Sequence, residues 1–243
     1  MRKSLDHKSF VPLYHQLKEI IERTIETGEW NPGDKILSEN EFRELYEVSR
    51  NTVQKAIDEL VQEGVLERKQ GRGTFVSKPK IDQPLIGFYS FSKVISSQGM
   101  VSKDIILDIQ TEQVHYNLAQ ELQIANNEEV ISLKRLRTAN GEPIILETSY
   151  LPKKYVSEIK KQDLDTYSLY DLLEKKHDVF VVKAKETFEP VLVREEEGEL
   201  LEVEAGSPGL LLDRIAYDLD GNIIEYCRSI VRGDRCRFYT ELL

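Results

Sequence analysis

Residues 49–76, SRNTVQKAIDELVQEGVLERKQGRGTFV, decide the fold of the N-terminal part of the chain. Ser49 is a helix N-cap candidate, and the apolar residues after it recur at helical spacing until Gly64. Two short runs, 65–68 and 74–76, then flank a glycine-containing turn. The stretch therefore predicts a helix that is followed by a β-hairpin wing.

Two more helices are predicted upstream of Ser49. The segment 12–28 has apolar residues at helical spacing, with a proline at its start and a glycine at its end. Ser38 and Glu41 form the capping-box pattern S-x-x-E, which opens a short second helix. A connection of about three or four residues joins this helix to the next, as a helix-turn-helix requires. The order predicts a winged helix-turn-helix DNA-binding domain over 1–77, followed by a linker over 78–84.

Residues 85–243 predict a second domain of mixed structure. Asn140-Gly141 and Asp220-Gly221 lie between apolar runs and indicate hairpin turns. We expect strands over 105–111, 129–138, 142–151, 180–191, 210–218, 222–232 and 237–242, and helices over 116–122, 168–176 and 193–201. The pattern is typical of an α+β domain in which helices flank an antiparallel sheet.

Composition limits the function classes. With 40% hydrophobic and 31% charged residues among 243, the chain is expected to fold into globular domains. A net charge of −10 excludes nucleic-acid binding through bulk positive charge, so any DNA contact has to be local. The sequence has no membrane-length apolar run and no secretory signal pattern, so we expect a cytoplasmic protein without a membrane partner. Its four histidines and two cysteines lack ligand spacing, and we expect no metal and no cofactor.

The N-terminal run from PLYHQLKEII to GRGTFV resembles the GntR family of bacterial transcription regulators. The later runs LKRLRTANGEPIILETSYLP, SLYDLL and EYCRSIVRGDRCRFY resemble the UTRA effector-binding domain of the HutC subfamily. Together these resemblances cover nearly the whole chain. They imply a homodimeric, ligand-responsive repressor whose second domain, over 85–243, has a chorismate lyase-like fold and also dimerises.

Residues near the start of the helix after Ser49 are the first candidates for DNA contact. Arg50 is suited to guanine and Gln54 to adenine, whereas small hydroxyls and Lys55 are suited to phosphates. The wing turn adds Lys and Arg side chains next to glycine residues, an arrangement that is suited to the minor groove of DNA. The predicted DNA-binding set is Ser38, Asn40, Ser49, Arg50, Asn51, Thr52, Gln54, Lys55, Arg68, Lys69, Gly71 and Arg72. The alternatives are a solvated helix face and an ordinary exposed hairpin.

Departures from the family pattern predict an altered operator. Similar family members often carry arginine where this chain has Asn40 and Gln54, and proline where it has Leu37. Asn and Gln prefer adenine edges to guanine. We therefore expect an operator that differs from the common family consensus at those positions.

Effector-binding candidates lie in the second domain. Arg135 and Arg137 alternate on one strand face and are positioned to converge on one anion, and Ser168 opens a helix beside Tyr170. The predicted effector set is Phe91, Ser92, Arg135, Arg137, Glu147, Ser168, Tyr170 and Glu225, of which Phe91 and Ser92 come from the UTRA resemblance alone. The alternative is that Arg135 with Glu147, and Arg228 with Glu225, are structural ion pairs.

The expected function is a repressor released from a palindromic double-stranded operator by a small anionic effector, such as a sugar phosphate or an organic acid. Val231 replaces a tyrosine that is common in the family, which leaves an amino-sugar phosphate effector in doubt. The alternative is a lyase-like enzyme fused to a DNA-binding domain. Because common catalytic motifs are missing from the sequence, we predict that the chain is not an enzyme and has no catalytic residues.

Overall fold

The computed structural model describes residues 4–69, 71–85 and 91–242. The chain divides into two compact units, residues 1–79 and residues 80–243, and each is described by itself. The short linker expected over 78–84 differs from this division, because its residues 81–84 form a strand of the second unit.

The described part of the first unit has three helices and a two-stranded wing, as predicted. In chain order these are α1 (Leu13–Glu26), α2 (Glu39–Tyr46), α3 (Arg50–Gln62), β1 (Leu66–Lys69) and β2 (Gly73–Val76), with β1 and β2 antiparallel. The capping box of α2 is present: the Ser38 hydroxyl accepts from the Glu41 amide at 3.3 Å, and the Glu41 carboxylate accepts from the Ser38 amide at 2.7 Å. Local capping therefore fixes where the second helix begins.

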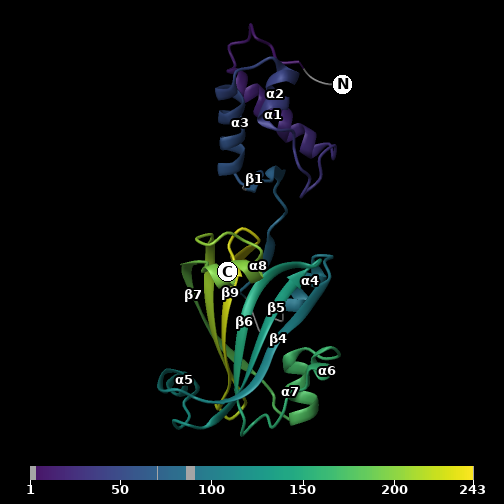
Figure 1. Ribbon diagram of the computed structural model, residues 1–243. Helices are drawn as coiled ribbons and strands as arrows, with labels where there is room; N and C mark the ends of the chain where they lie inside the picture. Colours follow the sequence, from purple (N-terminus) through teal and green to yellow (C-terminus); the bar gives the residue numbers. More distant parts are fainter. Residues whose placement is uncertain (1–3, 70, 86–90, 243) are drawn as a thin grey trace. The chain divides into compact units, whose positions relative to one another are not determined.

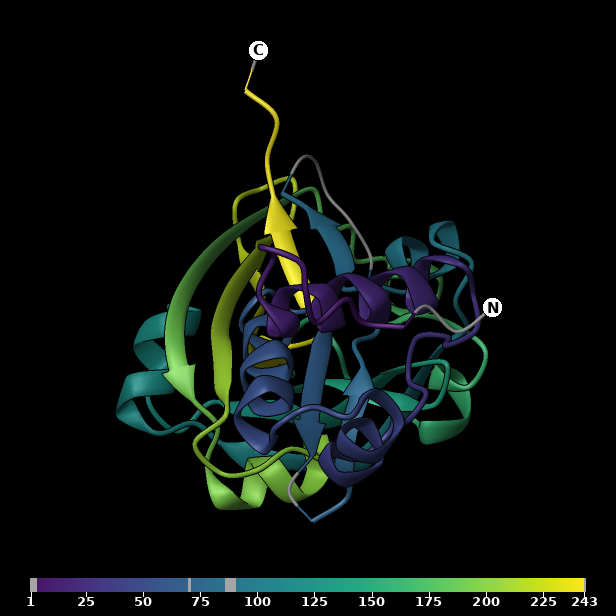
Figure 2. The same ribbon diagram turned by 90° about the horizontal axis from the view of Figure 1, so that it is seen from above.

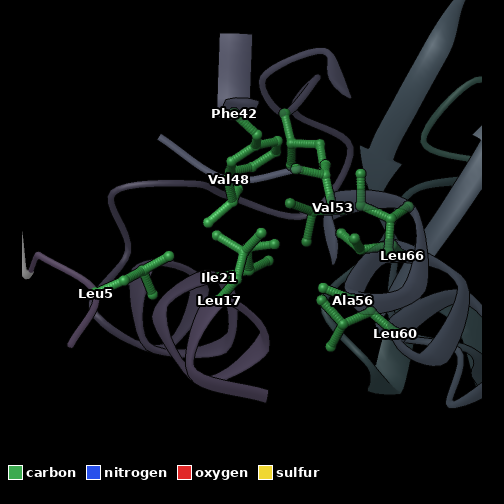
Figure 3. Close-up of a cluster of buried hydrophobic side chains, with 12 residues drawn as sticks. Leu5, Leu17, Ile21, Phe42, Val48, Val53, Ala56, Leu60 and Leu66 are labelled. Carbon is green, nitrogen blue, oxygen red and sulfur yellow. The ribbon is translucent and has the colours of Figure 1, made fainter. Parts of the chain in front are cut away.

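Apolar side chains from all three helices and the wing form the core of the first unit (Figure 3). Leu17 and Ile21 come from α1, Phe42 from α2, Leu60 from α3 and Leu66 from β1. All five are almost completely buried. Since one face of α3 is buried in this core, its opposite face is left for solvent or a partner.

The described part of the second unit contains a six-stranded antiparallel sheet (Figure 1). Its strands, in spatial order, are β4 (Ser102–Gln113), β5 (Glu129–Ala139), β6 (Glu142–Pro152), β9 (Ile223–Arg232), β8 (Pro208–Tyr217) and β7 (Lys183–Leu192). The α+β prediction is confirmed. Strand β7 begins later than expected, because Val179 and Val181 pack against an apolar cluster as irregular chain instead of joining the sheet.

Helices cover the ends of both sheet faces. They are α4 (Phe91–Ser97), α5 (Tyr116–Leu122), α6 (Lys161–Leu164), α7 (Leu169–His177) and α8 (Glu195–Leu201). We call the face that carries Arg135, Glu147 and Arg214 the inner face. Apolar residues of α4 and α7 join two separate clusters with residues of this face, and those of α5 and α8 join two clusters on the opposite face. The middle of the inner face is therefore bracketed by α4 and α7.

A small parallel pair joins the two ends of the second unit. Strand β3 (Ile81–Pro84) lies beside β10 (Cys236–Tyr239), with Ile81 opposite Cys236 (Figure 2). Ile81 and Gln83 are buried, and they belong on the side of the strand that faces the inner-face cluster around α4. Two prolines and mixed charge obscured this strand in the sequence.

Candidate nucleic-acid interface and ligand pocket

The outward face of α3 carries much of the predicted DNA-binding set. Asn51, Gln54 and Lys55 are exposed and line a shallow hollow together with the acidic Asp58 and Glu59. Ser49 caps the helix: its hydroxyl accepts from the Thr52 amide at 3.2 Å and lies 2.8 Å from the Thr52 hydroxyl. The structure thus brings these residues to one helix face and its N-terminal end.

Three predicted residues already have contacts within the unit, namely Lys55, Asn40 and Ser38. The Lys55 ammonium lies 3.8 Å from the ring centroid of Tyr14 on α1. The side-chain oxygen of Asn40 accepts from Arg43 at 3.3 Å, on the exposed side of α2. Ser38 is exposed, but its hydroxyl already accepts the Glu41 amide in the capping box of α2. These polar side chains of the helix-turn-helix therefore already have partners within the first unit.

Acidic residues tie the wing to the helices. Arg68 on β1 pairs with Asp58 on α3 at 2.6 Å and with Glu39 on α2 at 3.8 Å. Glu39 also lies 3.6 Å from the guanidinium of Arg50. Neither acid is among the residues predicted for this surface, although Asp58 follows Gln54 and Lys55 at helical spacing.

The wing turn brings the remaining predicted residues together. The Arg72 amide donates to the Lys69 carbonyl at 2.9 Å, and Gly71 has a φ of +68°, a left-handed conformation that favours glycine. The Lys69 ammonium pairs with Glu67 at 3.0 Å. Arg72 and Gly71 are exposed at the tip.

Two arginines and two acids form a network on the inner face. Arg135 lies opposite Glu147 in the β5–β6 register and forms an ion pair with it. Arg137 contacts Asp104 at 3.1 Å and Glu147 at 3.5 Å, and Arg135 contacts Asp104 at 3.5 Å. The two guanidiniums lie on one face of the strand, and in this structure they converge on the protein's own carboxylates. The side chains of Arg135 and Glu147 are only 5% and 7% exposed.

A second network lies beside the first. The Tyr170 hydroxyl donates to the Glu225 carboxylate at 2.5 Å, and Arg214 donates to Glu186 at 2.6 Å. A small cavity is lined by parts of both networks, namely by Phe91, Arg135, Arg137, Glu147, Ser168, Leu169, Tyr170, Arg214, Glu225 and Cys227. The cavity includes seven of the eight predicted effector residues. Ser168 also caps α7, because its hydroxyl accepts from the Asp171 amide at 3.3 Å.

The start of α4 completes this site. The Arg137 guanidinium lies 4.8 Å from the ring centroid of Phe91, and it donates to the Ser92 hydroxyl at 3.4 Å. Ser92, the eighth predicted residue, therefore contacts the network through Arg137.

One of the two alternative ion pairs is wrong. Arg228 contacts Asp213 at 3.8 Å, and its side chain is 52% exposed. Glu225 is buried, with the Tyr170 hydroxyl as its hydrogen-bond donor. Residues three apart on a strand point to opposite faces, so Arg228 and Glu225 cannot meet across it. The other pair, Arg135 with Glu147, is present.

Sequence reasoning missed Asp104, Glu186 and Arg214 of these networks. It also missed Ser149, whose hydroxyl accepts from Arg135 at 3.4 Å. Arg214 has the same strand parity as the buried Leu212, and that signal was available in the sequence. Asp104 reaches Arg137 because the β4–β5 register places the two opposite each other. A register shift follows between Ile106 and Asp108, and the sequence contained no sign of it.

Charge and burial set the ionisation of the site. Burial opposes ionisation of Glu147, but Arg135 and Arg137 outweigh it, so the pKa of this carboxyl lies below its ordinary value. Burial, and then the Glu225 carboxylate, raise the pKa of the Tyr170 hydroxyl well above its ordinary value. Burial also raises the pKa of the Cys227 thiol to about 12. At neutral pH the site therefore presents an ionised Glu147 carboxylate, a neutral Tyr170 phenol and a neutral Cys227 thiol.

Among the described residues, no group of three histidine, cysteine or acidic side chains is placed to hold a metal ion. Within the same ranges, none of the helices has the length and apolar character needed to cross a membrane.

Comparisons with known proteins agree with this architecture. Residues 13–76 match the family model described as bacterial regulatory proteins, gntR family, and residues 97–237 match the UTRA domain. The HTH-type transcriptional repressor NagR of Bacillus subtilis (strain 168) is 34% identical over 97% of this chain and 96% of its own length. The mannosyl-D-glycerate transport/metabolism system repressor MngR of Escherichia coli (strain K12) is 28% identical over 93% of this chain and 94% of its own.

The crystal structure of PhnF from Mycobacterium smegmatis superposes with a TM-score of 0.63. It is 31% identical in sequence and covers 93% of this chain and 98% of that one. The resemblance therefore extends over both units.

Proposed function

Because the chain belongs to the GntR family of bacterial regulatory proteins and carries a UTRA domain, we propose that it is a repressor which a small anionic effector releases from a palindromic operator. Its relative NagR is named a transcriptional repressor, and its relative MngR is named a repressor of a transport and metabolism system. The chain is thus a DNA-binding transcriptional regulator and not an enzyme, and the lyase-like alternative is set aside.

The effector half of the proposal depends on one observation, the adjacent arginines on the inner face, of which Arg135 is buried and Arg137 is half-buried. Arg135 and Arg137 lie side by side and share Asp104 and Glu147 as partners. A phosphate or carboxylate that enters the cavity competes with these carboxylates for guanidinium N–H groups, which favour bidentate oxygen anions. The name of MngR links that relative to a sugar bearing a carboxylate. We infer a sugar phosphate or an organic acid as effector.

The DNA half depends on the exposed face of α3 and on the wing. The N-terminal end of α3 offers Arg50, Asn51 and Gln54 to base edges, while the wing tip offers Arg72 to phosphate. A homodimer would present two such units to two half-sites, which is why the operator is expected to be palindromic.

Release requires that the effector bind one arrangement of the dimer better than the other. A hundredfold loss of operator affinity corresponds to about 2.7 kcal/mol of differential binding. Two or three charge-assisted hydrogen bonds to the arginines supply energy of that order.

Selection of operator sequences from random duplex DNA tests the DNA half. We expect an inverted repeat that differs from the common family consensus, and Arg50→Ala is expected to weaken binding to it at least tenfold. Arg23→Ala, an exposed arginine of α1, is the matched control and should bind as the wild type does. Recovery of the unchanged consensus contradicts the Asn40 and Gln54 argument, and the absence of any enriched sequence contradicts operator binding itself.

Thermal unfolding in the presence of small anions tests the effector half. Glucose 6-phosphate, glucosamine 6-phosphate and citrate are suitable probes, with Tyr170→Phe as a variant that keeps the ring but loses the hydroxyl. An effector is expected to raise the midpoint of the wild type, to raise that of the variant less, and to release the selected operator. A compound that raises the midpoint without releasing DNA contradicts its role as effector.

A further inference from the structure

Gln83 occupies a position in β3 where an apolar side chain would be expected. It is 3% exposed and lies on the side of the strand that carries Ile81, which belongs to the apolar cluster beneath α4. Within the described residues, its side-chain Nε2 atom has no hydrogen-bond partner. A buried amide N–H without a partner is destabilising, so folding alone does not account for this side chain.

The amide lines a second hollow that adjoins the arginine cavity. Residues common to both hollows are Phe91, Arg137, Glu147, Arg214 and Cys227. The second hollow adds Gln83 from β3, Phe238 from β10 and apolar residues of the sheet, among them Val231. Each hollow has a volume of about 40 Å³, which holds only a small group, so a larger molecule has to extend over both. One is mainly charged, and the other is mainly apolar with a single amide.

We propose that the effector spans both hollows and that Gln83 donates a hydrogen bond to an oxygen at the far end of the molecule. This proposal rests on the proposed effector function of the pocket. The molecule carries a phosphate or carboxylate for Arg135 and Arg137 at one end. At the other end it carries a small apolar group with a carbonyl or hydroxyl oxygen, such as an acyl group, that packs against Val231.

The position of Gln83 links this contact to the chain that leads to the first unit. Strand β3 begins directly after the residues that connect the two units. It is held by its neighbours: the Ile81 amide donates to the Arg235 carbonyl at 2.7 Å, and the Gln98 side chain bonds both the amide and the carbonyl of Asp82, at 3.1 and 2.8 Å. An effector that bonds to Gln83 therefore acts directly on the strand that continues into the connection.

The stability of the ligand-free protein tests whether the Gln83 amide is unsatisfied. Gln83→Leu removes the unpaired N–H at similar volume, and we expect its thermal midpoint to rise by roughly 2–4 °C. Gln98→Leu is the matched control: it removes an amide whose hydrogen bonds are made, and its midpoint should fall. A fall for Gln83→Leu as well would show that the amide has a structural partner and would overturn the proposal.

Binding of matched probes tests the contact itself. Glucosamine 6-phosphate and N-acetylglucosamine 6-phosphate differ by one acetyl group, which supplies a carbonyl oxygen and a methyl, and inorganic phosphate reports on the arginines alone. Gln83→Leu is expected to leave phosphate binding unchanged and to weaken the acetylated probe at least tenfold. Equal affinity of the acetylated probe for variant and wild type would overturn the proposal.

The two proposals fail in different ways. If no probe shifts the wild-type midpoint, the effector function is contradicted, and the ligand-free midpoints decide the role of Gln83. If the acetylated probe binds and releases operator DNA equally well in both proteins, the effector function stands and the role of Gln83 is excluded.

Discussion

Arg135 shows how a single buried charge can be costly to remove. It contacts Glu147 and Asp104, so Arg135→Met leaves the buried Glu147 and the half-buried Asp104 without this partner. We expect this change to destabilise the protein by about 3–5 kcal/mol. The double variant Arg135→Met with Glu147→Leu should recover most of the loss, because the charges disappear together. Urea unfolding of the single and double variants measures the coupling, and simple additivity of the losses would contradict it.

The Glu147 carboxyl also predicts a pH dependence. Burial raises the pKa of Glu147, but Arg135 and Arg137 lower it by a larger amount. Its pKa in the folded protein therefore lies below the ordinary value of 4.5. A depressed folded pKa contributes stability that is complete above the ordinary value and is lost as pH falls through the folded one. As the pH is lowered below about 4.5, the thermal midpoint of the wild type should therefore decrease, and that of Glu147→Gln should decrease less steeply. Identical acid slopes would exclude this carboxyl as a cause.

The two cysteines should be inert in the folded protein. Cys227 and Cys236 are both buried, and burial raises the pKa of each thiol to about 12. Since the thiolate is the reactive form, we expect slow labelling by a disulfide reagent at pH 8 and two rapidly labelled thiols after denaturation. Rapid labelling of the native protein would show that the inner face opens to solvent.

At the scale of elements, the wing contains cations with two different surroundings. Arg68 is tied to Asp58 and Glu39, whereas Arg72 lies exposed at the tip. We expect Arg72→Ala to reduce the slope of log affinity against log salt concentration by about one, because one phosphate contact is lost. Arg68→Ala should instead lower the stability of the first unit and leave this slope nearly unchanged. Equal slopes for the wild type and Arg72→Ala would place the tip away from the duplex.

Local signals explain which elements could be predicted. The capping box at Ser38, the N-cap at Ser49 and helical spacing act within a few residues, so α1, α2 and α3 were predicted close to their observed bounds. Strand β3 is held by β10, from the far end of the chain, and its four residues carry no comparable local pattern. The helices α4 and α6 are short and were also missed.

The site shows the same division between local and distant information. Strand alternation predicted that Arg135 and Arg137 share a face, because it depends on one strand only. The partners Asp104 and Glu186 depend on register between strands, which tertiary packing sets. The predicted pairing of Arg228 with Glu225 is wrong because the two residues are three apart on β9 and therefore lie on opposite faces of the sheet.

At the scale of the whole molecule, the division into two units predicts separable activities. Both hollows of the pocket lie within residues 80–243, and α3 and the wing lie within residues 1–79. A fragment of residues 80–243 should therefore fold and keep the probe-induced rise in midpoint, while it loses operator binding. Comparison of the fragment with the full chain by thermal unfolding and gel shift checks this. Loss of the probe response in the fragment would mean that the pocket requires the first unit.

The pairing of β3 with β10 has a consequence for synthesis on the ribosome. Strand β3 has no partner strand until β10 has been synthesised, whereas the first unit is complete once Val76 has emerged. Domains generally fold in order as the chain appears, so the DNA-binding unit can form while the sensor is still open. A premature stop codon before residue 236 would then yield a truncated product whose first unit is intact but whose second unit lacks strand β10. If the second unit binds an effector as proposed, such an allele would give a DNA-binding protein that no longer responds to that effector.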